Sequence, residues 1–242
     1  MALIDLICHY GIQQETLSLN SGSAEDAKAY ADRLKLDILC FISSEAALDL
    51  DGGNAHLQQL LATDNRFRGW LTLSQHQPDL STKLAHEHLT KPQWIGAAFS
   101  QTTDGDALNT ENGLEILNSL RRFGRPVLLT VTSPHTLEAA IAVAKAINHL
   151  RFIIAPQSAS LTSNAIPAMK SILNLSLLPS VQFAERDVIA EAVESIGERR
   201  ILWGSDWGLC NPTAALGMIK DSAITASARE RIAFRNAKEL LK

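Results

Sequence analysis

The clearest indication of the fold is one stretch, PVLLTVTSPHTLEAAIAVAKAI, at residues 126–147. Its first part, Pro126–Val131, is a short apolar run that predicts a buried strand. Ser133 followed by Pro134 is typical of a helix start, because serine caps free backbone N–H groups and proline fits the first helical position. The remainder places apolar side chains in one stripe at helical spacing. The stretch therefore predicts a strand followed directly by an amphipathic helix.

The same unit recurs along the whole chain. Apolar runs that predict strands begin 21 to 35 residues apart, which is the length of one strand plus one crossover helix. Eight such units predict a parallel sheet closed as a single-domain (β/α)8 TIM barrel over residues 1–242. An open doubly wound sheet is the alternative, although no GxGxxG turn follows the first run. The predicted strands are Ala2–Ile7, Asp37–Ile42, Phe67–Leu73, Trp94–Phe99, Pro126–Val131, Arg151–Ala155, Ile172–Leu177 and Arg200–Gly204.

Composition excludes several classes of protein. The 242 residues are 46% hydrophobic and 20% charged, as in ordinary globular domains, which excludes disordered and fibrous proteins. No apolar run reaches the roughly 18 residues of a membrane helix, and we expect no signal peptide because the first residues lack a basic segment. The net charge of -4, without a basic block, gives no support to nucleic-acid binding. Three cysteines without a CxxC pair favour a reduced, cytoplasmic protein.

Asp206 is the strongest candidate for chemistry. In a TIM barrel the reacting groups lie at the carboxyl ends of the strands. Asp206 follows the last predicted strand and a Gly-Ser pair, and Trp203 and Trp207 would give its carboxylate partly apolar surroundings. A carboxylate in such surroundings is suited to act as a general base. A loop aspartate that caps the next helix is the alternative interpretation, and both stay open.

His9 is the second candidate, at the end of the first predicted strand. Because side chains alternate along a strand, Asp5, Ile7 and His9 are predicted to share one face and Cys8 to lie on the other. His9 could act as a base, a ligand or a substrate contact, or pack as an ordinary strand-end histidine. A buried acid at Asp5 needs a partner, and the sequence names none. Further candidates for substrate binding at strand ends are Trp207, His76, Thr130, Gln157 and His135.

The chain resembles the amidohydrolase-related TIM barrels of the amidohydrolase 2 type, a family of metal-dependent hydrolases and decarboxylases. The segment Arg200–Trp207, RILWGSDW, is similar to the family's strand-eight motif, and Asn236–Leu241 is similar to its terminal helix. The segment Ile4–His9 falls where the family has its D-x-H-x-H motif. The stretches 126–130 and 152–155 look like its fifth and sixth strands, so the resemblance covers essentially the whole chain.

The resemblance implies a metal site that this chain matches only in part. In the family, two first-strand histidines, a fifth-strand histidine and the strand-eight aspartate hold a metal, and a sixth-strand histidine assists. Here Ile7 stands in place of the first histidine, and Thr130 stands in place of the fifth-strand histidine. The sixth-strand position holds Pro156, or Gln157 if the register is shifted by one residue. Isoleucine cannot bind a metal, and a neutral threonine hydroxyl is a poor zinc donor.

Only His9 and Asp206 remain of the family's ligand set. Because a catalytic zinc site normally has three protein ligands plus water, we expect no resident metal and no other cofactor. Zinc or another divalent metal, held with help from His76 or His135, is the alternative. The family analogy favours metal-independent, hydrolase-like chemistry on a small, cyclic or carboxylate-bearing substrate, with Asp206 as general base and His9 assisting. The competing hypothesis is a catalytically degenerate barrel that binds a small molecule or serves in an assembly, and a homo-oligomer stays open.

Overall fold

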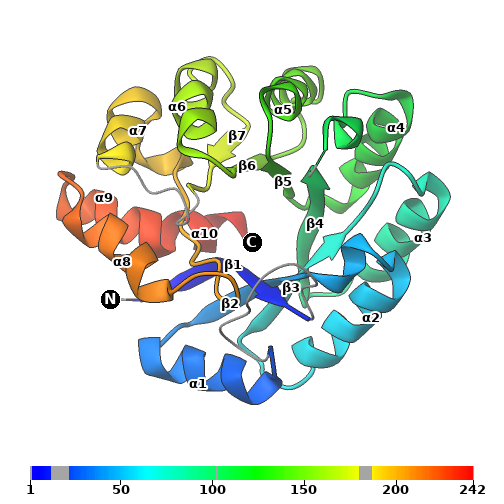
Figure 1. Cartoon of the computed structure of the whole chain (residues 1–242), viewed down its shortest axis with the longest axis horizontal. Helices are drawn as coiled ribbons and strands as arrows, with labels where there is room; N and C mark the ends of the chain where they lie inside the picture. Colours follow the sequence, from blue (N-terminus) through cyan, green and yellow to red (C-terminus); the bar gives the residue numbers. More distant parts are fainter. Residues whose placement is uncertain (1, 12–21, 102, 180–186, 242) are drawn as a thin grey trace.

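The described residues form a curled, seven-stranded parallel sheet surrounded by helices (Figure 1). The computed structural model describes residues 2–11, 22–101, 103–179 and 187–241. Strands that are consecutive in the sequence are neighbours in the sheet, in the order β1 to β7. The strands are β1 (Ile4–Tyr10), β2 (Ile38–Ser43), β3 (Phe67–Thr72), β4 (Trp94–Gln101), β5 (Val127–Val131), β6 (Phe152–Pro156) and β7 (Leu175–Leu177).

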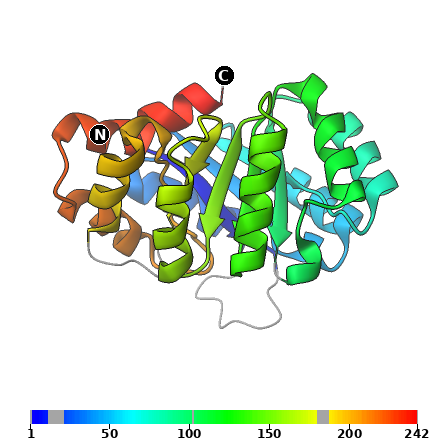
Figure 2. The same ribbon diagram turned by 90° about the horizontal axis from the view of Figure 1, so that it is seen from above.

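Helices follow the strands and cover the outer side of the sheet, as Figure 2 shows after a 90° turn. The predicted helix start at Ser133 is confirmed, because its Oγ accepts a hydrogen bond from the backbone N of Thr136 at 3.2 Å. Within the described ranges, no helix combines the length and apolarity needed to cross a membrane. The helices are α1 (Ala24–Leu34), α2 (Leu50–Leu61), α3 (Pro78–His88), α4 (Glu111–Leu120), α5 (Pro134–Ala146), α6 (Ala159–Ala168), α7 (Val188–Ile196), α8 (Pro212–Asp221), α9 (Ala226–Glu230) and α10 (Asn236–Leu240).

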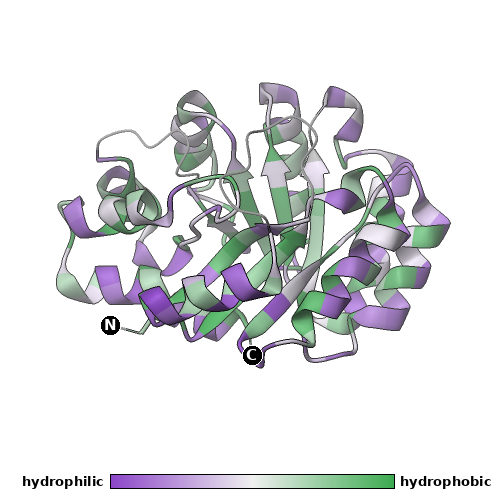
Figure 3. Ribbon diagram, turned by 60° about the horizontal axis from the view of Figure 1, so that its bottom comes forward, coloured by the Kyte–Doolittle hydropathy of each residue, from purple (hydrophilic) through white to green (hydrophobic). Residues whose placement is uncertain are grey.

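Apolar side chains from the strands pack on both faces of the sheet. Along β2, the buried Cys40 belongs to the cluster inside the barrel, while its neighbour Phe41 belongs to the cluster between sheet and helices. Trp70 and Leu128 fill the interior from other strands. Figure 3 shows apolar colour along much of the sheet and a mixture of hydrophilic and apolar colour on the helices. The apolar runs predicted as strands are therefore buried on both faces, as expected of a parallel sheet.

The last predicted strand, Arg200–Gly204, is not a regular strand in the structure. Arg200 ends a short 3₁₀ helix, η5 (Glu198–Arg200), and the residues after it form an irregular closing segment, 201–207, with isolated bridges at its two ends. The N of Leu202 donates to the O of Leu177 in β7 at 2.8 Å. On the other side, the N of Leu6 in β1 donates to the O of Trp203 at 3.2 Å. The closing segment thus joins the two edge strands and completes the predicted barrel.

Strand β1 breaks its alternation near its middle. The register against β2 shifts between Asp5 and Cys8, and Leu6 and Ile7 both belong to the interior cluster. Asp5 instead bonds to Tyr30 of α1, on the outer side of the sheet. The prediction that Asp5 shares a face with Ile7 and His9 is therefore wrong, because an irregularity in the strand reverses the alternation between them.

The close contact between Gly204 and Ile7 makes a test of how the closing segment packs. A Cβ added at Gly204 would lie 2.4 Å from Cγ2 of Ile7, which is only 3% exposed. We expect Gly204→Ala to lower the free energy of unfolding by about 1–3 kcal/mol in urea denaturation, because the packed interior has to shift.

Gly217→Ala in α8 is the matched control for this substitution. A Cβ there would meet nothing nearer than 3.9 Å, and alanine is the better helix former, so this variant should be as stable as the original chain or slightly more stable. Equal losses of stability in both variants would contradict the proposed packing of Gly204 against Ile7.

Candidate active site

The structure brings His9 and Asp206 into direct contact at the carboxyl edge of the sheet, which is the end where the strands finish. Nε2 of His9 lies 3.3 Å from Oδ1 of Asp206. The side chain of Asp206 is 6% exposed and that of His9 is 18% exposed, so the imidazole is the more open of the two groups. The two residues that sequence analysis ranked highest therefore form one hydrogen-bonded pair, although they are far apart in the sequence.

Asp206 occupies a left-handed backbone conformation, with φ of 52°. This conformation is uncommon for residues other than glycine, so the surrounding structure has to stabilise it. The N of Asp206 donates to the O of Ile7 at 3.0 Å, and its O accepts from the N of Cys210 at 2.9 Å. Gly208 follows with φ of 98°, and a Cβ there would lie 2.7 Å from the O of His9. The turn is thus fixed tightly against the end of β1.

The buried carboxylate of Asp5 fixes the closing segment next to this turn. Its Oδ1 accepts from the N of Ser205 at 2.9 Å, and its Oδ2 accepts from Oγ of Ser205 at 2.5 Å. The hydroxyl of Tyr30 in α1 donates to the same Oδ2 at 2.7 Å. Oγ of Ser205 accepts in turn from the N of Trp207 at 3.0 Å. These are the partners of Asp5 that the sequence could not name.

Burial dominates the electrostatics of this network. It raises the pKa of Asp5 above the usual 3.8, while the hydrogen bonds from Ser205 and Tyr30 act in the opposite direction. Burial, followed by the nearby charge of Asp5, raises the pKa of Tyr30, so the phenol remains a neutral donor. The network therefore joins β1, α1 and the closing segment through hydrogen bonds that water does not reach.

The structure places Trp207 on the outer side of the barrel. Its indole is 2% exposed and stacks on Tyr30, with ring centroids 5.4 Å apart and planes 6° apart. Phe41 meets the same indole edge-on, with centroids 6.2 Å apart. Trp203 also belongs to the cluster between sheet and helices. The two tryptophans thus pack behind the closing segment, and a substrate contact from Trp207 stays a prediction.

The polar residues predicted at other strand ends are distributed over the same carboxyl edge. Thr130 lies two residues after the interior Leu128 of β5, and it is half-buried. Gln157 follows the interior Ala155, and its Nε2 donates to the O of that residue at 3.2 Å. Because Ala155 faces the interior, Gln157 rather than Pro156 continues that face. Substrate contacts from Thr130 and Gln157 stay predictions.

The two loop histidines do not join the His9–Asp206 pair in the described residues. Nε2 of His76 lies 2.9 Å from Oδ1 of Asp106, and the His76 side chain is 58% exposed. This pair lines a cavity of about 130 Å³ at the ends of β3 and β4, together with Gln75. His135 is exposed on the first turn of α5. Substrate contacts from His76 and His135 stay predictions.

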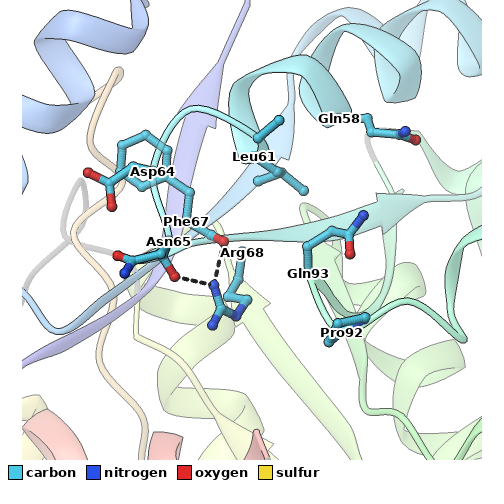
Figure 4. A pocket seen from close by; sticks show the side chains of 9 residues that line it. Gln58, Leu61, Asp64, Asn65, Phe67, Arg68, Pro92 and Gln93 are labelled. Atoms are coloured by element: carbon cyan, nitrogen blue, oxygen red, sulfur yellow. Dashed lines mark hydrogen bonds between the residues drawn. The ribbon is translucent and has the colours of Figure 1, made fainter.

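A cavity of about 410 Å³ lies at the opposite end of the barrel (Figure 4). Phe67, the first residue of β3, lines it together with Gln93, which directly precedes β4. Nη1 of Arg68 donates to the O atoms of Asn65 and Phe67, at 2.7 Å each, so its guanidinium is used in backbone contacts. Since the reacting groups of TIM barrels lie at the carboxyl edge, this cavity is separate from the candidate active site.

The chain belongs to the amidohydrolase family, whose model matches residues 46–242. A dihydroxybenzoic acid decarboxylase from Polaromonas, solved with manganese and 2-nitroresorcinol, is similar in structure, with a TM-score of 0.77, 16% identity and 99% and 96% of the two chains covered. A 5-carboxyvanillate decarboxylase from Novosphingobium aromaticivorans, solved with manganese, is similar with a TM-score of 0.76 and 14% identity. The match covers 99% of this chain and 96% of the decarboxylase. Amidohydrolase 2 from Bifidobacterium longum is similar with a TM-score of 0.73 and 13% identity, and the match covers 100% of this chain and 98% of the other. These structures confirm the TIM-barrel fold, whereas no curated protein sequence matches the chain.

The described residues do not fit the metal site that the family implies. His9 and Asp206 offer two donors, and these bond to each other. Ile7 is buried in the interior cluster, and Thr130 and Gln157 are neutral. Among the residues with described positions, no group of three or more histidine, cysteine, aspartate or glutamate side chains is arranged to hold a metal ion. A catalytic site of the usual kind needs one more ligand than this pair provides.

The hydrogen bonds to Asp5 predict how its replacement changes stability. Asp5→Leu would leave the N and Oγ of Ser205 and the hydroxyl of Tyr30 without their buried acceptor, at about 1–3 kcal/mol for each group. We therefore expect the free energy of unfolding to fall by several kcal/mol in urea denaturation. Tyr30→Phe removes the contacts of one hydroxyl with Asp5 and Ser205 but leaves Asp5 bonded to Ser205, so it should cost only about 1 kcal/mol. An Asp5→Leu variant as stable as the original chain would show that the network contributes nothing.

The raised pKa of Asp5 predicts a dependence of stability on pH. The folded chain binds this proton more tightly than the unfolded chain, whose carboxyl has the usual pKa of 3.8. The resulting stabilisation is complete below that pH and is lost as the pH rises through the raised pKa. Relative to Asp5→Asn, which cannot ionise, the original chain should therefore lose stability over that window. A difference in unfolding free energy between the two proteins that stays constant with pH would contradict this expectation.

Proposed function

We propose that this chain is an enzyme that hydrolyses a small molecule at the His9–Asp206 pair without a resident metal. The observation that supports this most directly is the contact of 3.3 Å between the imidazole and the carboxylate. The pair lies where TIM-barrel enzymes place their reacting groups. The turn around Asp206 and the Asp5 network support the same proposal, because they hold the carboxylate in one orientation.

Asp206 is the general base in this proposal. Its ionised carboxylate takes a proton from a water molecule as the water oxygen adds to a carbonyl carbon of the substrate. The bond from that carbon to the leaving oxygen then breaks, and the leaving oxygen recovers the proton from Asp206. His9 assists as the Nε2–H tautomer, which donates to Oδ1 and orients the carboxylate.

The substrate class proposed is a small cyclic ester or a related carboxylate-bearing compound. Support comes from the family and from similar structures, among them decarboxylases solved with small substituted benzoates or resorcinols. Hydrolysis is favoured over decarboxylation for this chain because the pair provides a base for water. The described residues offer no third ligand for a metal that could bind a substrate carboxylate.

A barrel that has lost catalysis is the second candidate function. Two observations favour it: Ile7 and Thr130 stand where the family has ligands, and the interior around Ile7 is filled with apolar side chains. In that case the chain would bind a small molecule or serve in an assembly without turnover. Binding of small lactones or carboxylates without any product, under conditions where the chain is folded, would favour this candidate.

Metal content tests the metal-free part of the proposal. We expect elemental mass spectrometry to find well under one zinc or manganese per purified chain, before and after incubation with either ion. Two protein ligands, His9 and Asp206, are too few to replace the water molecules that hydrate the ion. Chelator treatment should leave any activity unchanged. One tightly bound metal per chain, lost together with activity, would contradict the proposal.

Substitution of Asp206 tests its role as the base. We expect Asp206→Asn to lower the turnover of responsive lactones by about 10²–10⁴-fold, because the amide cannot accept the proton. Asp79→Asn, at an exposed aspartate on α3, is the matched control and should turn over normally. Circular dichroism and thermal unfolding show whether each variant is folded. Full turnover by folded Asp206→Asn would remove Asp206 from the mechanism.

A further inference from the structure

Three arginines line one open cavity at the end of the barrel opposite the candidate active site. The cavity has a volume of about 430 Å³, and Arg122, Arg125 and Arg151 lie on its wall. Arg125 and Arg151 stand just before β5 and β6, which are neighbours in the sheet. The N of Val127 donates to the O of Arg151 at 2.9 Å, so the two strand entries are joined at this point. The cavity is thus built on rigid strand ends.

The positive charge around this cavity is not balanced by acidic side chains. The cavity wall contains no aspartate or glutamate, and within the described residues none of the three arginines forms an ion pair with a carboxylate. Nη2 of Arg151 donates to the O of Gly124 at 3.2 Å, and Nη2 of Arg122 bonds to Nε2 of His86. Burial, and next the positive charge of Arg125, lower the pKa of Arg151. The three arginines thus give this wall a positive charge that an anion would balance.

We propose that this cavity binds the phosphate group of a small molecule. Guanidinium groups present several N–H donors in a plane, which matches the oxygens of a phosphate. Leu89 and the ring of Phe123 add an apolar wall for the remainder of the ligand. The volume lies within the roughly 300–1,000 Å³ typical of small-molecule sites. An extended polyanion is not favoured, because the chain has a net charge of -4 and no basic block that would continue the surface.

Isothermal titration calorimetry at low ionic strength tests this site on the full chain. The probes are inorganic phosphate, phenyl phosphate and a short single-stranded oligonucleotide. We expect saturable binding of phenyl phosphate with one site per chain, and weaker binding of inorganic phosphate, which cannot use the apolar wall. Equal affinity for both would show a site for free phosphate instead, and tighter binding of the oligonucleotide would overturn the small-molecule proposal.

Single substitutions assign the binding to the cavity. Arg125→Ala and Arg151→Ala should each weaken phenyl phosphate binding roughly tenfold or more, since each removes charged hydrogen bonds to the phosphate. Arg121→Ala removes the same charge from an exposed neighbour that does not line the cavity and should leave binding unchanged. Arg125→Lys keeps the charge and should lose less affinity than the alanine variant. No saturable binding, or the same loss in all three alanine variants, would overturn the proposal.

Discussion

The hydrogen bonds between the buried carboxylate of Asp5 and Ser205 are the constraint on which the rest of the site depends. They fix the closing segment against β1 at distances of 2.5 to 2.9 Å, in a region where the segment has no regular strand geometry of its own. Tyr30 completes the network from α1 and stacks on Trp207. Because these hydrogen bonds join buried groups that water does not reach, the loss of one partner leaves the others unpaired. The position of Asp206 opposite His9 follows from this arrangement.

Most of the fold could be predicted from the sequence, because strands buried on both faces and amphipathic helices have different periodicities. The stretch at 126–147 shows this most clearly, since its strand, serine cap and helix all appear where expected. The closing segment could not be predicted as irregular, because its apolar run from Ile201 looks like the others. What differs is the left-handed turn at Asp206, and a side-chain pattern does not reveal backbone angles. The register shift in β1 was hidden for the same reason.

The candidate site was predictable in its central pair and not in its support. His9 and Asp206 stand out because each is a titratable side chain at the end of an apolar run, in a segment that resembles one of the family's motifs. Tyr30 gives no such signal, since an aromatic residue on the buried stripe of a helix is ordinary. Asp106 likewise lies in a polar loop, and only the three-dimensional structure pairs it with His76. Contacts between distant segments depend on the curvature of the sheet, which the alternation of residue types does not contain.

The hydrogen bonds between Asp5 and Ser205 join residues that are 200 positions apart. During synthesis, β1 leaves the ribosome long before the closing segment exists, so an unpaired edge on β1 has to wait for nearly the whole chain. Such an edge favours pairing with other chains, and contacts of this sequence separation form slowly. The closing segment, which carries Asp206, therefore pairs with β1 only after most of the chain has been made. Closure of the barrel and formation of the contact between His9 and Asp206 are one event in this protein.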